Sequence, residues 1–393
     1  MPLQPVYIAG VGMTPFHRPS VLIGYEQLAP QAVQLALTDA GVEYTDIQQI
    51  YAGWAYGDTT SGQRALASLG ATGVPFFNVN NACSSGSSAL YLARQAVQNG
   101  AVDCALVVGF EQMPAGALEL FFIDRSSVLE LHAAIADKTI DPSSGPLTPR
   151  IFAAAGVEHM RRDGISAEAY AMIAVKARAH AARNPKAAYQ NPVSIAEVLS
   201  SRAIVSPLTK LQCCPPTSGA AAAIICSASY AKRNGLSTDV ELKGMGLTSD
   251  TNSTFSGSAI SMVGYDISAR AASHAYNESG ISPNEIDVVE LHDCFTINEA
   301  LSYESLGLTS KGTAEKFIVD GNNTYGGSVV VNPSGGLLSK GHPLGATGLA
   351  QITELTLQLR GQAQARQVPN ARTALQHNVG LNGAAVVSVL VKN

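Results

Sequence analysis

Two pairs of similar segments, far apart in the chain, constrain the fold more than any other feature of the sequence. Segments 35–53 and 274–292 each carry a helical stretch that ends on a glycine, Gly41 or Gly280. Each then runs through an acidic turn into an apolar strand. A glycine after a helix supplies the left-handed conformation that closes the last turn. The first pair therefore predicts the same helix–turn–strand unit at two places.

The second pair follows in the same order along the chain. Residues 83–86 (CSSG) and 342–345 (HPLG) each open an Ala- and Leu-rich helix, with the glycine three positions after the first residue. Chance similarity between two α/β turns is the alternative explanation for one pair alone. Two pairs in one order favour a duplicated architecture, in which one half contributes Cys83 and the other contributes His342 at matching places.

Strand-like and helix-like stretches alternate along most of the chain, which predicts an α/β fold with parallel sheets. Segment 116–200 breaks the alternation and contains Leu120, Phe121 and Phe122. This segment could be an insertion that covers a site, or it could be a dimerisation arm. Both interpretations stay open. The predicted division is an N-terminal half at 1–115 with 201–235, an inserted loop domain at 116–200, and a C-terminal half at 236–393.

The composition excludes several classes of protein. The 393 residues carry a net charge of −5, and only 14% of them are charged, so neither a disordered chain nor a general nucleic-acid binder is expected. No uninterrupted apolar run is long enough for a membrane span. The six cysteines form no CxxC pair, which favours free thiols in a reducing compartment. We expect a cytoplasmic protein; the end of the sequence matches no peroxisomal tripeptide, although a peroxisomal location stays open.

Cys83 is the first candidate for chemistry. It follows a strand-like run at 76–81 and precedes a helix. A thiol at a helix N-terminus lies near the positive end of the helix dipole, so we expect a lowered thiol pKa and a nucleophilic role. An ordinary buried cysteine is the alternative.

His342 lies at the matching junction of the second half, flanked by Gly341 and Pro343. An imidazole in this position could accept a proton from a cysteine or donate a hydrogen bond to an oxyanion. A capping or packing histidine is the alternative, but the match to Cys83 favours the chemical role.

Three further segments carry candidate residues. His292 and Cys294 follow a buried strand, where α/β sheets place their sites. A zinc site made of these two residues with Cys83 and His342 fits no standard ligand spacing, so no metal is expected. Cys213 and Cys214 are expected to be core or loop thiols. The glycine-punctuated loop at 377–383 could bring backbone N–H groups close to a ligand, or be a tight turn.

Taken together, these motifs resemble the thiolase superfamily. The NACSSG setting of Cys83, the GHP turn at 341–343 and the duplicated halves carry the general resemblance. The blocks HDCF at 292–295 and QCCP at 212–215, with NTYGG and NPSGG further along, make the chain similar to the sterol-carrier-protein-type thiolases. The resemblance extends over essentially the whole chain.

The resemblance implies a five-layered αβαβα fold of two βαβαβαββ halves with an inserted loop domain, assembled as a homodimer. It implies a 3-ketoacyl-CoA thiolase of fatty-acid β-oxidation, with acyl-CoA and coenzyme A as substrates and no bound cofactor. In that family Cys83 would hold the acyl group, His342 would activate it and line an oxyanion hole with His292, and Cys294 would be the second acid/base. The backbone near Cys83 and Gly380 would form a second oxyanion hole, for the tetrahedral intermediate.

The sequence departs from the classical thiolases at its C-terminal motif. The Cys-x-Gly that supplies their second cysteine is absent, and His377 or Asn378 stands near its place. Cys294 is therefore the better candidate for the second acid/base, while His377 stays open. A biosynthetic Claisen-condensing acyltransferase, or a carbon–carbon lyase acting with a small accessory or carrier-protein subunit, is the alternative function. A non-enzymatic lipid-binding protein is a third.

Overall fold

The first half of the chain forms a five-stranded sheet with its helices. The computed structural model describes residues 3–116, 122 and 124–393. The elements of this half are β1 (Val6–Met13), α1 (Tyr25–Ala40), β2 (Gln49–Gly53), α2 (Ser61–Leu66), β3 (Phe76–Val79), α3 (Ser85–Gln98), β4 (Cys104–Glu111), β7 (Gly219–Ser227) and α8 (Ala228–Asn234).

The second half repeats this plan. Its elements are β8 (Val240–Thr248), α9 (Ala259–Met262), α10 (Tyr265–Ser279), β9 (Val288–Glu290), α11 (Thr296–Ser305), α12 (Ala314–Val319), β10 (Val330–Val331), a π-helical turn (Gly336–Lys340), α13 (Leu344–Arg360), β11 (Thr373–Val379) and β12 (Ala385–Lys392).

The strand order confirms the duplication. The strands run β3-β2-β4-β7-β1 in the first half and β10-β9-β11-β12-β8 in the second, and the two sets join edge to edge where Tyr7 of β1 pairs with Glu241 of β8. In both helix–turn–strand units the helix ends at a glycine in the same left-handed conformation. Gly41 and Gly280 each have φ +71°. The predicted fold class is thus confirmed; the residue boundaries of the three predicted parts stay predictions.

The parallel sheets predicted from the alternation of strands and helices are correct only in part, because both sets of strands are mixed. β2 pairs in parallel with β3 and β4, but β7 runs antiparallel to β1 and β4, and β12 runs antiparallel to β11 and β8. The chain turns directly from β11 into β12 through the short loop 380–384, which allows only an antiparallel pair. Alternation of strands and helices does not reveal such a closing strand.

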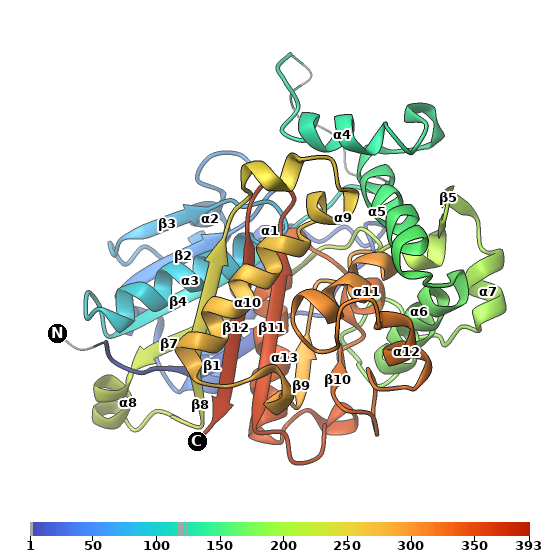
Figure 1. The fold of residues 1–393 in the computed structure, drawn as a ribbon. Coiled ribbons are helices and arrows are strands. Elements are labelled where there is room, and N and C mark those ends of the chain that lie inside the picture. Colours follow the sequence, from blue (N-terminus) through green and yellow to red (C-terminus); the bar gives the residue numbers. More distant parts are fainter. Residues whose placement is uncertain (1–2, 117–121, 123) are drawn as a thin grey trace.

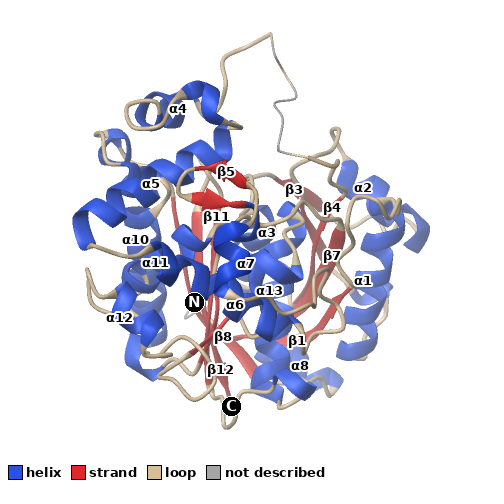
Figure 2. Ribbon diagram, turned by 90° about the vertical axis from the view of Figure 1, so that its right-hand side faces the viewer, coloured by secondary structure: helices blue, strands red, loops and turns tan. Residues whose placement is uncertain are grey.

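The helices divide into three layers around the two sets of strands. α1 packs on β1 and β7, α10 packs on β8 and β12, and α3 and α13 pack on each other and on the inner faces of the strands. Figure 2 shows α3 and α13 between the strands, with α1 and α2 on one side and α10 and α11 on the other. The result is the five-layered arrangement in which the helices that follow Cys83 and His342 share the central layer.

The inserted segment forms its own helices over the second half. It contains α4 (Glu130–Ala136), α5 (Leu147–Asp163), α6 (Ala167–Ala181) and α7 (Ile195–Ser200), and the short strands β5 (Ala203–Val205) and β6 (Leu208–Thr209) follow it. Helices α5 and α6 pack against α11, and Figure 1 shows this group beside α11 and α12. Leu120 and Phe121 lie outside the described residues, and Phe122 is exposed beneath the guanidinium of Arg125.

The central layer is packed backbone against backbone. A Cβ added at Gly109 of β4 would lie 2.1 Å from the carbonyl oxygen of Gly345, and one added at Gly86 of α3 would lie 2.4 Å from the same atom. Neither Cβ could be accommodated without moving the start of α13. Glycine at these positions therefore fixes where the segment beginning at His342 lies relative to Cys83.

We predict that Gly109→Ala destabilises the protein. Overpacking against backbone costs roughly 1–3 kcal/mol, so the thermal midpoint should fall by several degrees in a calorimetric or fluorescence melt. Gly24→Ala is the matched control, because its Cβ would meet only the movable carboxylate of Glu26. Equal midpoints for the two variants would contradict the close approach of β4 and α13.

Candidate active site

The reactive atoms of Cys83, His292 and His342 form one cluster. The Cys83 sulfur and one nitrogen of each imidazole lie within 4.8 Å of one another. The rings of His292 and His342 are nearly perpendicular, with centroids 5.1 Å apart. The structure thus brings together Cys83 and His342, as their matching positions predict, and adds the imidazole of His292 from the second half.

Cys83 sits in a strained turn just before α3. Its neighbour Ala82 has φ +50°, a left-handed conformation that is uncommon for a residue with a side chain. The turn is held by Ser85, whose hydroxyl donates to Ala82 O at 2.6 Å and accepts the Asn81 N–H at 3.0 Å. Strain of this kind is typical of functional turns, and here it keeps the thiol partly accessible at the helix N-terminus.

The hydrogen bonds of His342 define its proton-accepting atom. Its Nδ1 lies 2.7 Å from the Thr347 hydroxyl, and that hydroxyl donates its proton to Pro343 O at 3.0 Å. The hydroxyl must therefore accept from Nδ1–H, which leaves the lone pair on Nε2. Within the described part of the chain Nε2 has no hydrogen-bond partner. His342 is thus prepared to take a proton from the neighbouring thiol.

His292 is held in the opposite tautomer. The Asn378 amide lies 2.9 Å from its Nδ1, and the Asn378 oxygen accepts from the Ser87 hydroxyl at 3.0 Å. The Asn378 nitrogen therefore faces His292 and donates to Nδ1, which places the ring proton on Nε2. An Nε2–H is the group that an oxyanion needs, so the two imidazoles offer one acceptor and one donor.

Burial keeps these groups neutral. Removal from water lowers the pKa of His342 to about 3 and lowers the pKa of His292 well below its ordinary value, with the neighbouring His342 and His377 adding to the effect on His292. The pKa of the Cys83 thiol is raised to about 12 by burial and by the negative charge of Glu111. The expected lowering of the thiol pKa by the helix N-terminus is therefore wrong, because desolvation outweighs the dipole.

Cys294 lies beside this cluster. It is buried at the start of α11, and the pKa of its thiol is raised well above the ordinary value by burial and by the nearby thiols of Cys214 and Cys83. Its carbonyl oxygen accepts the Cys214 N–H at 2.8 Å. Cys214, expected to be a core or loop thiol, is thus a neighbour of both proposed catalytic cysteines.

His377 points away from the thiols. Its neighbours on β11, Gln376 and Asn378, bond to Ser87 in the central layer, while His377 Nε2 lies 2.8 Å from the Ser268 hydroxyl on α10. Alternate residues of a strand face opposite sides, which accounts for the difference. This geometry favours Cys294 over His377 as the second acid/base, which stays a prediction.

Gly380 is not a free oxyanion donor. Its N–H donates to Ala384 O at 2.8 Å, because residues 380–384 form the turn between β11 and β12. A Cβ at Gly380 would lie 2.1 Å from Asn81 O. The contribution of this glycine is therefore close approach to the Cys83 turn, and the predicted use of its backbone N–H is corrected.

Glu111 was not recognised from the sequence. Its buried carboxylate accepts the N–H groups of Ala55, Tyr56 and Gly345 at 3.0, 2.9 and 3.1 Å, and burial raises its pKa to about 7. It ties the loop after β2 to the start of α13. The sequence signal that could have identified Glu111 is a single acidic residue at the carboxyl end of a buried strand.

Comparison with known proteins agrees with this geometry. Residues 6–229 match the model of the thiolase N-terminal domain, and residues 249–393 match that of the thiolase C-terminal domain-like family. The chain belongs to the thiolase family. It is 48% identical to sterol carrier protein 2 of Gallus gallus over 98% of this chain and 71% of that protein, so the likeness to the sterol-carrier-protein type is confirmed.

Two further relatives bear on the activity. The chain is 34% identical to an acetyl-CoA acetyltransferase of Methanothermobacter thermautotrophicus, over 98% of this chain and 99% of that one. A solved structure titled Ltp2-ChsH2(DUF35) aldolase superposes with a TM-score of 0.83 at 25% identity, over 99% of this chain and 98% of that one. This thiolase is an acyltransferase. In the described part of the chain, no helix combines the length and apolar character needed to cross a bilayer.

We predict that Thr347→Val slows acyl transfer by roughly ten- to a hundredfold in kcat/KM. The valine keeps the shape but removes the acceptor that fixes the His342 tautomer, and loss of an orienting partner typically costs this much. Steady-state kinetics check the prediction. Thr353→Val is the control, because Thr353 donates to Leu349 O on the same helix, remote from the site. Similar rates for both variants would remove the proposed role of Thr347.

The pH profile of kcat/KM tests the electrostatics separately. A histidine works as a base only when it is neutral. Because the pKa of His342 is lowered to about 3, the loss of activity at acid pH should lie below pH 5 rather than near the ordinary histidine value of about 6.5. The raised thiol pKa predicts no titration of Cys83 in the free enzyme below about pH 9. An acid limb at pH 6–7 in the folded enzyme would contradict a neutral buried His342.

Proposed function

We propose that this thiolase cleaves 3-ketoacyl-CoA with coenzyme A, through an acyl group carried on Cys83, to give acetyl-CoA and a shortened acyl-CoA. The observation that carries the proposal is the thiol of Cys83 within reach of a proton-accepting nitrogen of His342 and a proton-donating nitrogen of His292. Nucleophile, base and oxyanion donor are the three parts that acyl transfer through a thioester requires.

In the first half-reaction the Cys83 sulfur attacks the 3-keto carbon while its proton passes to His342 Nε2. Transfer concerted with attack suits a thiol whose pKa is about 12, because a free thiolate would be rare. The bond between C2 and C3 then breaks, and its electron pair becomes the enolate of acetyl-CoA. The imidazolium of His342 and the Nε2–H of His292 stabilise the enolate oxygen, and the Cys294 thiol protonates its carbon.

In the second half-reaction coenzyme A releases the acyl group. The Cys294 thiolate takes the proton of the coenzyme A thiol, and the coenzyme A sulfur attacks the Cys83 thioester. Cys83 leaves as a thiolate and recovers its proton from His342. Cys83 and Cys294 thus both end the cycle as thiols, and the net proton transfer is from the coenzyme A thiol to the methyl carbon of acetyl-CoA. The reaction needs no metal or bound cofactor, which stays a prediction, as does the assignment of these roles.

A carbon–carbon lyase acting with a partner subunit is the second candidate. The structural similarity to the Ltp2-ChsH2(DUF35) aldolase favours it. A retro-aldol cleavage needs no acyl-thiol intermediate, however, so it gives no reason for placing Cys83 against His342. The cluster of Cys83, His292 and His342, with Cys294 beside it, therefore supports thiolysis.

Trapping of the intermediate separates the two candidates. Incubation with acetyl-CoA should add one acetyl group to the wild-type chain, located on Cys83 by peptide mass spectrometry. Cys83→Ser should carry none, because a hydroxyl is a much weaker nucleophile at neutral pH. Cys104→Ser is the control, since Cys104 is a buried thiol of β4 outside the cluster, and it should acetylate like the wild type. No adduct in the wild type would overturn the thiolase mechanism.

The homodimer and the substrate range are further parts of the proposal. β3 is the last strand of its sheet and exposes Phe77, and an unpaired apolar edge is suited to pairing with a second copy of the chain. For the substrate we expect tolerance of medium to long acyl chains. Thiolysis assays over short, long and branched 3-ketoacyl-CoAs would measure this range, and a strict preference for acetoacetyl-CoA would contradict it.

A further inference from the structure

A second cluster of polar side chains lies outside the active site, where the inserted segment meets α11. His159 and Asp163 are one helical turn apart on α5, and Glu304 lies in the last turn of α11. Each offers one ligand atom, and these atoms lie within 4.8 Å of one another. His159 and Glu304 side chains are 0% exposed, and Asp163 is 12% exposed. None of these groups takes part in the proposed reaction.

Two atoms in this cluster lack a hydrogen-bond partner. They are Nε2 of His159 and Oε2 of Glu304, and both are fully buried among the described residues. His159 Nε2 points at the carboxylates, 3.5 Å from Asp163 Oδ2 and 4.0 Å from Glu304 Oε1. These separations are long for hydrogen bonds. They are close to the roughly 3.4 Å between neighbouring ligands of a tetrahedral metal with bonds of about 2.1 Å.

Arg162 does not satisfy these atoms. Its guanidinium donates to both carboxylate oxygens of Asp163, with Nε 2.9 Å from Oδ1 and from Oδ2, but its Nη2 stays 3.8 Å from Glu304 Oε2. His159 Nε2 and Glu304 Oε2 are therefore both left without a hydrogen-bond partner, and Oε2 makes only a long ion pair, with Arg162.

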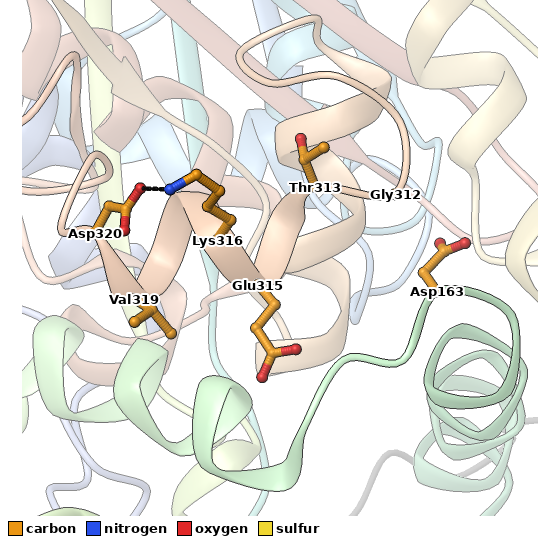
Figure 3. Close-up of a pocket in the computed structure, with 7 residues that line it drawn as sticks. All are labelled: Asp163, Gly312, Thr313, Glu315, Lys316, Val319 and Asp320. Atoms are coloured by element: carbon orange, nitrogen blue, oxygen red, sulfur yellow. Dashed lines mark hydrogen bonds and ion pairs between the residues drawn. The ribbon is translucent and has the colours of Figure 1, made fainter.

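The surroundings complete the features that a metal site requires. Tyr170 holds the second nitrogen of His159, with its hydroxyl 2.9 Å from Nδ1, and the Gly312 N–H donates to Glu304 Oε1 at 2.9 Å. Partners of this kind orient metal ligands. Asp163 also lines a surface cleft of about 460 Å³, and Figure 3 shows it facing the start of α12 across that cleft. The cleft provides an entry path and room for a water ligand.

We propose that His159, Asp163 and Glu304 bind a divalent transition-metal ion of the zinc class, which links the inserted segment to α11. One imidazole and two carboxylates favour zinc over calcium or magnesium, which prefer oxygen ligands alone. The ion would lie among the one nitrogen and the two carboxylate oxygens that these residues place within 4.8 Å of one another. Its position joins α5 to the helix that begins beside Cys294.

The test uses the full chain with Cys83→Ser, which removes the thiol of the only other His/Cys/Asp/Glu metal cluster among the described residues. After treatment with a chelator, equilibrium dialysis against zinc should restore one zinc ion per chain. Asp163→Asn and Glu304→Gln, each added singly, should weaken binding by at least about tenfold. Asp320→Asn is the matched control, because Asp320 lines the same cleft but pairs with Lys316.

X-ray absorption of the zinc-loaded chain gives a second measurement that does not depend on the variants. Nitrogen and oxygen ligands near 2.0–2.2 Å, with an imidazole and no sulfur near 2.3 Å, are expected. A sulfur ligand, the failure of zinc to bind stoichiometrically, or calcium binding as tightly as zinc would each overturn the proposal. So would zinc affinity unchanged in both Asp163→Asn and Glu304→Gln. If either variant does not fold, the other and the absorption spectrum decide.

Discussion

The active site depends on one close approach, that of the start of α13 to the backbone of the first half. The carbonyl oxygen of Gly345 lies where a side chain at Gly86 or Gly109 would stand, and a side chain at Gly345 would itself meet Gly53 O at 2.5 Å. Contacts of this kind allow little adjustment, because the groups in contact are backbone on both sides. Cys83 and His342 come from different halves of the chain, more than 250 residues apart in sequence, yet their helices share one layer. The duplicated architecture therefore assembles the site, and loss of this packing would separate nucleophile from base.

Burial then decides the chemistry that the site can perform. The same desolvation that raises the pKa of the Cys83 thiol lowers the pKa of His342, so both groups rest in their neutral forms. The role of each histidine then depends on which of its two ring nitrogens carries the proton. One neighbouring side chain determines this for each ring. Thr347 fixes His342 as an acceptor, and Asn378 fixes His292 as a donor. Two identical side chains thereby obtain opposite roles from hydrogen bonds to different partners.

The sequence predicted what depends on local patterns and missed what depends on tertiary contacts. The glycine-ended helices and the matched positions of Cys83 and His342 were sufficient to predict the duplicated fold and the thiol–imidazole cluster. The alternation of strands and helices did not give the antiparallel direction of the closing strands, because strand direction follows from how the chain enters the sheet. The thiol pKa was mispredicted because the amount of water excluded around Cys83 is set by surrounding segments. Glu111 and the occupied N–H of Gly380 depend on partners far away in the chain or across a turn, which spacing does not reveal.

Helix α11 connects the chemistry to the inserted segment. All ten of its residues are buried, and its Asn298 amide donates to the carbonyl of His292. On the same helix, the Glu299 carboxylate forms an ion pair with Lys176 of α6 in the insertion. Moving α6 away from α11 would leave each of these charges buried without its partner, which is strongly destabilising. The ion pair therefore holds α6 and α11 in one arrangement. The insertion and the loop that carries His292 and Cys294 are therefore joined through a single rigid helix. We therefore expect changes in the insertion that shift this helix to alter kcat as well as KM.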